Sequence, residues 1–439
     1  MARIHFFTCK KVSSLEAMMH EGCQERFTHN DIIPHVNNPY PPLAPDPRRL
    51  VVVKALYFLY FAAVGGFFYY LYIYYNQIGL TSAQIGILSS VGPLIAILSS
   101  PLWGWLSDHF SITRPLFIFA AAAGIGLTYL LGTTVQFGSI MILTILTAFF
   151  TNPLTTLLDS TTLVMLGERR DLYGQQRLWG SAGYIVTSLS FGYFLTAYGM
   201  HWIFPGYILI MGLYLLVCFG LPVRRPKVVT STAKFDKGIF QLLRQRNWIF
   251  FTASMIFMAV AMASIIAFLG VYMVRLGGSN GLVGTVGALG ALIEIPFMYL
   301  GSRLIRRFGT KTMLLVGYGG YFLRLLVYSV MRVPAWAFFG SVTNGFSYSF
   351  MQTSSVAFVD EITPARWKGT AMGLYNATYS MGGMINGVLN GFLLDAIGGG
   401  MFLVNAGLLV VAAVLLSFTG SKAGQPGAGQ IEEKPLIAG

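Results

Sequence analysis

The chain has 439 residues, of which 55% are hydrophobic and only 10% are charged. Soluble domains carry roughly 25% charged residues, so the composition excludes an ordinary water-soluble protein. The formal charge of +13 does not indicate nucleic-acid binding, because the basic residues lie in short connections between apolar runs rather than on one folded face.

The chain begins with a polar segment, residues 1–47, which becomes proline-rich toward its end. It lacks the apolar core and small-residue cleavage site of a signal peptide. We expect a disordered cytoplasmic tail. An over-long start is the alternative, since Met18 and Met19 offer later initiation sites.

Apolar runs of about 20 residues then recur, each long enough to cross a hydrocarbon core of about 30 Å as a helix. A first half, 48–222, contains six expected spans: 51–75, 84–107, 115–133, 140–167, 176–198 and 203–222. A basic cytoplasmic linker, 223–247, precedes a second half, 248–420, with spans at 249–274, 283–304, 311–330, 335–359, 370–393 and 398–418. A disordered tail, 421–439, is expected to follow. The predicted fold is an all-α membrane protein of about twelve transmembrane helices in two six-helix halves.

The basic residues predict the orientation, because Lys and Arg concentrate in loops that stay cytoplasmic. Most of those between the spans and in the linker fall on one side of the membrane, whereas Arg275 and Arg332 fall on the other. The set on the first side includes Arg114, Arg169, Arg170, Arg306, Arg307, Lys311, Arg366 and Lys368. We therefore expect a plasma (inner) membrane protein with both termini and the linker in the cytoplasm.

An internal repeat relates the two halves. Shifting the chain by 198 residues places the first two spans on spans seven and eight. The matched residues are Gly79, Gly86, Gly92, Leu94, Ile95 and Phe110 on Gly277, Gly284, Gly290, Leu292, Ile293 and Phe308. Two related halves around a central site form a recurrent transporter plan.

Asp159, Glu294 and Arg324 are charged residues well inside the expected spans, and Arg177 lies at or just within the start of one. A charge at the bilayer centre costs roughly 2.5–3.5 kcal/mol, so it needs a partner, a cavity or a function. A nearby arginine favours the charged carboxylate and desolvation disfavours it, so such groups can switch during proton coupling. The alternatives are a static ion pair in each half, and for Arg177 a loop charge.

No other chemistry is indicated. No histidine lies within a span, and the three cysteines form neither a disulfide framework nor a metal spacing. The run Gly277 to Gly281 matches the hydrolase pattern G-x-S-x-G but lacks the strand and helix that this motif requires. We expect no enzymatic activity, cofactor, metal or nucleic-acid partner.

Residues 50 to 420 resemble the major facilitator superfamily, and within it the group around lactose permease and the phenylpropionate permeases. The stretch from Gly104 to Asp108 is similar to the superfamily's cytoplasmic loop signature. The resemblance implies that Asp108 caps this loop, with Arg114 as its basic partner. The sequence departs from the signature at Ser111, where a glycine is usual, and at Arg306 in the second-half copy.

The most specific resemblance is Asp159 followed 18 residues later by Arg177, which is similar to the group's substrate-site acid and arginine. Tyr184 matches the position of an aromatic ring that stacks on the sugar in lactose permease. Glu294 with Arg324 resembles the phenylpropionate-permease pattern.

Some positions depart from lactose permease. Ala291 replaces a carboxylate, and Asn344 and Ser347 stand where lactose permease has its histidine and proton-binding glutamate. If protons drive transport, the resemblance leaves Glu294 or Asp159 to carry them.

The leading hypothesis is a monomeric, proton-coupled transporter of a small organic solute that works by alternating access in the lipid bilayer. Asp159, Arg177, Glu294 and Arg324 would line the central cavity, and Tyr184 and Asn344 would orient the solute. The same residues are compatible with an uncoupled facilitator or exporter, and the fold with a membrane receptor or assembly partner that does not transport.

Overall fold

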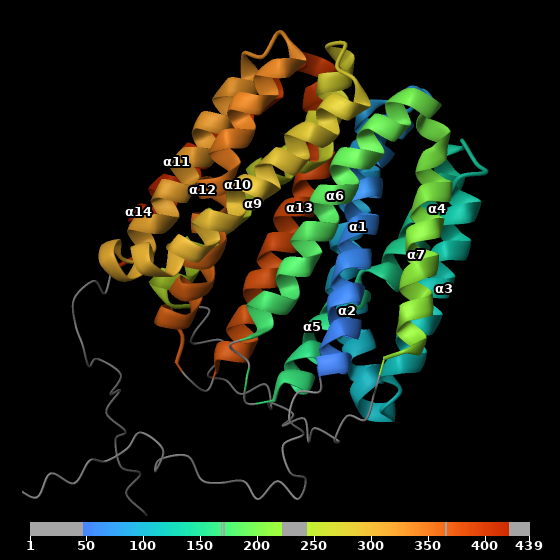
Figure 1. Ribbon diagram of the computed structural model, residues 1–439. Coiled ribbons are helices and arrows are strands. Elements are labelled where there is room, and N and C mark those ends of the chain that lie inside the picture. The colour runs from blue at the N-terminus through green and yellow to red at the C-terminus, as the bar shows by residue number, and fades with distance from the viewer. Residues whose placement is uncertain (1–46, 168, 170–171, 222–243, 365–366, 421–439) are drawn as a thin grey trace, which may run out of the picture. The chain divides into compact units, whose positions relative to one another are not determined.

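The computed structural model describes residues 47–167, 169, 172–221, 244–364 and 367–420. Regular structure in these ranges is helical, without strands (Figure 1). The predicted tails and most of the predicted linker lie outside the described residues, so the proposed domain boundaries stay predictions.

The N-terminal half contains seven described α-helices. They are α1 (Pro47–Gln77), α2 (Ser82–Phe110), α3 (Thr113–Leu131), α4 (Phe137–Thr151), α5 (Pro153–Leu166), α6 (Tyr173–Tyr198) and α7 (Ile203–Phe219). The predicted single span 140–167 is divided into α4 and α5 at Asn152. Pro153 explains the division, because proline lacks the N–H for a helical hydrogen bond and its ring clashes with the preceding turn.

The C-terminal half contains six described α-helices. They are α9 (Arg246–Arg275), α10 (Asn280–Phe308), α11 (Thr310–Ser329), α12 (Ala337–Ile362), α13 (Lys368–Ile397) and α14 (Gly400–Ser417). With α4 and α5 counted as one broken span, the described chain forms twelve long segments, and their edges lie within about four residues of those predicted. The prediction of two six-helix halves is confirmed (Figure 1).

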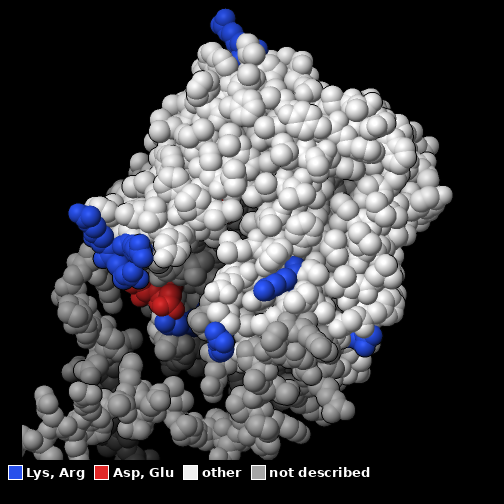
Figure 2. Space-filling model, viewed as in Figure 1, with Lys and Arg blue, Asp and Glu red and all other residues white. Residues whose placement is uncertain are grey.

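Eight of these segments are long and apolar enough to cross a membrane on hydropathy alone. The others are α6, α11, α12 and α13, which contribute polar side chains to the interior of the bundle. Such helices need not be uniformly apolar, because a neighbouring helix rather than lipid covers part of their surface. Charged side chains are sparse on the visible face of the molecule, and most lie over its lower half (Figure 2).

The backbone conformation at the start of α2 recurs 198 residues later at the start of α10, as the internal repeat in the sequence predicts. Thr81 caps α2 by accepting a hydrogen bond from the backbone N–H of Gln84 at 3.2 Å. Ser279, 198 residues later, caps α10 by accepting from Leu282 N at the same distance. The turns before both caps have a positive-φ glycine, Gly79 at 91° and Gly277 at 89°, as the predicted repeat requires.

In each half, a basic residue near the start of the third segment contacts the C-terminal end of the last helix of that half. Arg114 donates to the backbone carbonyl of Phe219, at the end of α7. Lys311 donates to the carbonyls of Ser417 and Thr419, at the end of α14, at 2.8 and 2.5 Å. Cations are favourable at helix C-termini, where the last carbonyls lack helical partners and the helix dipole is negative.

The two halves meet mainly where α2 packs on α13 and α6 packs on α10, with α1 beside α9. Ser90 Oγ donates to Met384 O at 2.8 Å across the first pair. A Cβ on Gly86 would lie 2.0 Å from the carbonyl oxygen of Gly387, so the close approach of α2 and α13 requires glycine. These contacts lie toward the end where α1 stops and α2 starts, which we call the closed end.

Candidate functional site

Asp159 lies on α5, where it is anchored to α1. The hydroxyl of Tyr57, a fully buried residue, donates to Asp159 Oδ1 at 2.6 Å. Tyr173, the first residue of α6, also lies close enough to interact electrostatically with Asp159. Hydroxyl groups therefore supply part of the hydrogen bonding that this carboxylate needs. Among the described residues, Asp159 forms no ion pair with Arg177.

Arg177 lies in the second turn of α6, so the interpretation as a loop charge is wrong. Its guanidinium lies 3.9 Å from the centroid of the Phe61 ring and 5.8 Å from that of Tyr57. Gly180 makes room for this contact, because a Cβ there would lie 2.7 Å from Phe61 Cδ2 and 2.9 Å from Arg177 Nη1. A guanidinium held over an aromatic face retains its N–H donors for other partners.

Arg324 lies on α11 and is only 7% exposed. Its Nε donates to the hydroxyl of Tyr328 at 2.9 Å, and its Nη1 donates to Asn344 Oδ1 on α12. Neutral groups thus hold this buried cation in place. A static ion pair between Arg324 and Glu294, one of the alternatives raised by the sequence, is not found in the described part of the chain.

Glu294 lies half-buried on α10, where Ser349 Oγ donates to its backbone carbonyl at 3.1 Å. Its carboxylate forms no hydrogen bond or ion pair with the residues that the structure describes. It does lie close enough to Arg177, on the opposite half, to interact electrostatically. The sequence grouped one acid with one arginine inside each half, whereas the structure brings an arginine of one half toward an acid of the other.

Several tyrosine side chains lie near these charged residues. Tyr184 lies 6.4 Å from Tyr69, ring centroid to centroid, and both side chains lie within electrostatic reach of Arg324. Tyr348 lies within electrostatic reach of Glu294 and Arg177, and Tyr321 within reach of Glu294 and Arg324. The sequence identified Tyr184 only through its resemblance. The other rings were missed because tyrosine is frequent here, with 23 in the chain.

The residues of the predicted loop signature lie together at the end of α2 that is remote from the closed end. Gly104 has open space where a Cβ would stand, and Asp108 is half-buried. Ser111 adopts a left-handed conformation, with φ of 53°. The guanidinium of Arg114 contacts the Phe219 carbonyl, as described above.

The described residues contain no group of three or more His, Cys, Asp and Glu side chains suited to a metal ion. Two pockets lie away from the four charges. One is formed by α11 and α14, and the other by α1 to α4 within the N-terminal half. Arg177 and Arg324 carry N–H donors and Glu294 carries a carboxylate acceptor, and the rings of Phe61 and Tyr328 lie beside the two guanidinium groups.

Comparison with known proteins places this architecture among transporters. A family model described as "MFS_1 like family" matches residues 50–404. The maltose permease of Geobacillus stearothermophilus is 28% identical over 357 residues, which cover 79% of this chain and 88% of the permease. A probable 3-phenylpropionic acid transporter of Escherichia coli (strain K12) is 26% identical over 372 residues, covering 82% and 95%.

A solved structure shares the fold. A crystal structure of the nucleoside transporter NupG superposes with a TM-score of 0.74 at 16% sequence identity. The match covers 85% of this chain and all of that one. The family model, the curated relatives and this fold agree on an integral, multi-pass membrane protein.

Proposed function

The chain belongs to the MFS_1 like family of the major facilitator superfamily, and we propose that it is a secondary transporter that couples a small organic solute to protons by alternating access. The observation that carries the proposal is the position of Glu294. Its carboxylate is half-buried and without a hydrogen bond to the described residues, and it lies within electrostatic reach of Arg177 on the opposite half.

The proposed coupling uses these two groups. When Glu294 is ionised, its attraction to Arg177 draws the two halves together at the level of the site. When Glu294 carries a proton, that attraction is lost, and Arg177 stays on the ring of Phe61 with its donors directed to a solute. Proton binding thereby changes the relative stability of two conformations, which is what a coupled transporter requires.

The same residues would bind the solute. Arg177 and Arg324 supply N–H donors, Asp159 and Glu294 supply acceptors, and the ring of Tyr184 offers an aromatic face. Sugars, nucleosides and aromatic acids all carry groups that fit part of this set, and relatives are named for maltose, nucleoside and 3-phenylpropionic acid transport. A thermal-shift screen of the purified protein against these three classes would identify a solute for transport measurements.

The coupling is tested by uptake of that solute into proteoliposomes with and without an imposed proton gradient. We expect Glu294→Gln to keep solute exchange but to lose its response to the gradient. The matched control is Glu361→Gln, because Glu361 is an exposed carboxylate at the end of α12 that accepts a hydrogen bond from Thr310. Gradient-driven uptake that persists in Glu294→Gln removes Glu294 from the proposed role.

Two alternatives give different results in the same assay. An uncoupled facilitator or exporter would exchange solute at one rate whether or not the wild-type vesicles carry a gradient. A receptor or assembly partner would show thermal stabilisation by the solute and no flux. The proposal also expects no enzymatic turnover of the solute, which analysis of the recovered solute checks.

The proposed orientation places the closed end outside the cell and both termini in the cytoplasm. Its basis is the unequal distribution of basic residues, with Arg306, Arg307 and Lys368 at the remote end of the helices and Arg332 near the closed end. A cysteine at exposed Val135, in the connection between α3 and α4, should react in intact cells with a membrane-impermeant maleimide. Protection of that cysteine until the cells are lysed would indicate the reverse orientation.

A further inference from the structure

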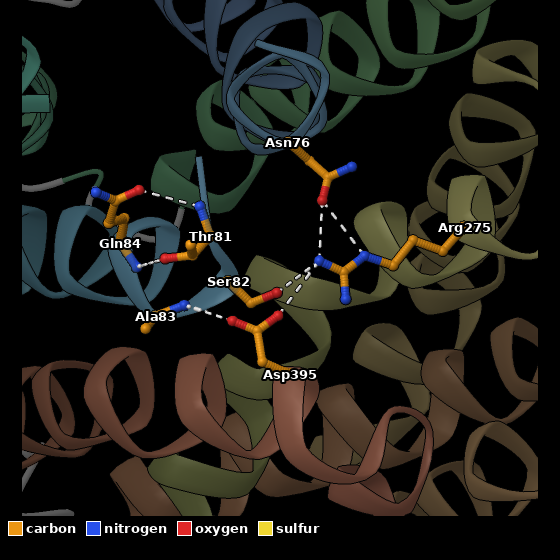
Figure 3. Close-up of polar contacts among 7 residues, drawn as sticks. All are labelled: Asn76, Thr81, Ser82, Ala83, Gln84, Arg275 and Asp395. Atoms are coloured by element: carbon orange, nitrogen blue, oxygen red, sulfur yellow. Dashed lines mark hydrogen bonds and ion pairs between the residues drawn. The ribbon is translucent and has the colours of Figure 1, made fainter. Parts of the chain in front are cut away.

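A polar cluster at the closed end lies outside the proposed solute site and is centred on Arg275, the last residue of α9 (Figure 3). Its Nε and Nη2 donate to Asn76 Oδ1 at 3.3 and 3.0 Å. Nη2 also donates to Ser82 Oγ at 2.6 Å and pairs with Asp395 Oδ1 at 3.5 Å. One guanidinium therefore joins the ends of α1, α9 and α13 to the start of α2.

Asp395 makes a further contact, with the start of α2. Its Oδ2 accepts a hydrogen bond from the backbone N–H of Ala83 at 3.3 Å. The first N–H groups of a helix lack helical partners and carry the positive end of the dipole, so a carboxylate there is favourable. Thr81 and Gln84 satisfy other groups of the same helix start through a reciprocal capping box. The helix α2 is thus capped in part by its own half and in part by the other half.

The cluster divides unequally between the halves. Arg275 and Asp395 both belong to the C-terminal half, whereas Asn76, Ser82 and Ala83 belong to the N-terminal half. Separation at this end would break every hydrogen bond from Arg275 and Asp395 to the N-terminal half. The ion pair could remain intact, because both of its members move together, so opening would not leave either charge without its partner.

We propose that the Arg275 and Asp395 pair is a latch: through its hydrogen bonds to the end of α1 and the start of α2, it favours the conformation that is closed at this end. The inference rests on the proposed alternation of the two halves but not on the identity of the solute or on proton coupling. Breaking the latch should raise the population in which the closed end is open and leave the fold intact.

The solvent exposure of the cluster indicates how far removal of the latch should change the ratio of open to closed molecules. The side chains of Arg275 and Asp395 are 34% and 41% exposed, and polar contacts near water contribute modestly because water replaces them when they break. The close contact of Gly86 with Gly387 lies deeper and continues to hold α2 against α13. We therefore expect removal of the latch to change the ratio of open to closed molecules by about five- to tenfold.

The test measures the distance between spin labels on the two halves by double electron–electron resonance. Labels at Val135 and Val333, which are 65% and 52% exposed in the connections after α3 and α11, report on the closed end. The background protein is the full chain with its three cysteines replaced. Arg275→Ala should transfer population to a longer distance, and Asn76→Ala, which removes a cross-half partner only, should do so to a smaller extent.

Lys368→Ala is the matched control. It removes an exposed ion pair with Asp360, 2.6 Å long, that lies within the C-terminal half at the remote end. Its distance distribution should equal that of the unsubstituted protein. The latch is overturned if Arg275→Ala and Asn76→Ala both leave the distribution unchanged in folded, monodisperse protein, or if Lys368→Ala shifts it equally. The readout needs neither solute nor gradient, so it separates failure of the latch from failure of the transport proposal.

Discussion

The hydroxyl of Tyr57 donates to the carboxylate of Asp159 at 2.6 Å, and this hydrogen bond ties α5 to α1 inside the N-terminal half. A hydrogen bond to a charged group contributes about 1.5–3 kcal/mol. Tyr57→Phe should therefore weaken solute binding by about ten- to a hundredfold, because Asp159 would lose the donor that orients it. Isothermal titration with the solute found by the thermal-shift screen measures the change.

A double-mutant cycle tests whether Tyr57 affects solute binding through Asp159. If Tyr57 acts through Asp159, Tyr57→Phe should have little further effect in an Asp159→Asn background. Tyr129→Phe, a substitution at an exposed position on α3, serves as the control and should leave binding unchanged. Equal losses from Tyr57→Phe in both backgrounds would contradict the proposed role of Asp159.

The sequence predicted the helices well because the membrane imposes a strong and simple rule on them. A span must be apolar over about 20 residues, so its edges follow from hydropathy. The same rule made the buried charges conspicuous, since an ionisable group inside such a span is costly. The division between α4 and α5 was missed, although Pro153 was visible as its cause.

The partners of the charges could not be predicted in the same way. Arg177 and Glu294 are far apart in the sequence, and their approach depends on how α6 packs on α10. Hydropathy does not determine that packing, because many rotations of a helix about its axis are compatible with the same apolar run. The contact of Arg324 with Asn344 likewise depends on the register of α11 against α12.

Ser111 and Gly309 occupy equivalent turns in the internal repeat. We expect opposite effects on stability when each is replaced by the residue type found at the other position. Ser111 has φ of 53° and ψ of 35°, a left-handed conformation that costs a non-glycine residue about 1–2 kcal/mol. Ser111→Gly removes this cost but makes the unfolded chain more flexible, so we expect a gain in stability of at most about 1 kcal/mol.

Gly309→Ser should be more damaging. Its φ of 83° and ψ of 156° fall in a region that is essentially restricted to glycine, and we expect a loss of about 1–3 kcal/mol. Thermal unfolding in detergent should show a small rise in Tm for Ser111→Gly and a clear fall for Gly309→Ser. Equal falls for both would mean that the turn at Ser111 stores no strain.

Gly183 is the glycine that allows α6 to approach α1 next to the site. A Cβ at this position would lie 2.1 Å from the carbonyl oxygen of Phe58, a backbone atom that can move only if α1 moves. Overpacking of this kind costs about 1–3 kcal/mol, so Gly183→Ala should lower the Tm. Displacement of α1 would also move Phe61 away from Arg177, which should weaken solute binding in the same variant.

Gly126→Ala is the matched comparison for Gly183→Ala, because Gly126 also lies within a helix, α3, but an added Cβ there would meet no neighbouring side chain or other helix within 4 Å. There, the higher helix propensity of alanine should stabilise the protein by about 0.5–1 kcal/mol. The two substitutions make the same chemical change, so opposite shifts in Tm would isolate the steric contact with Phe58. Shifts of the same sign would show that helix propensity, rather than the approach of α6 to α1, determines the response at Gly183.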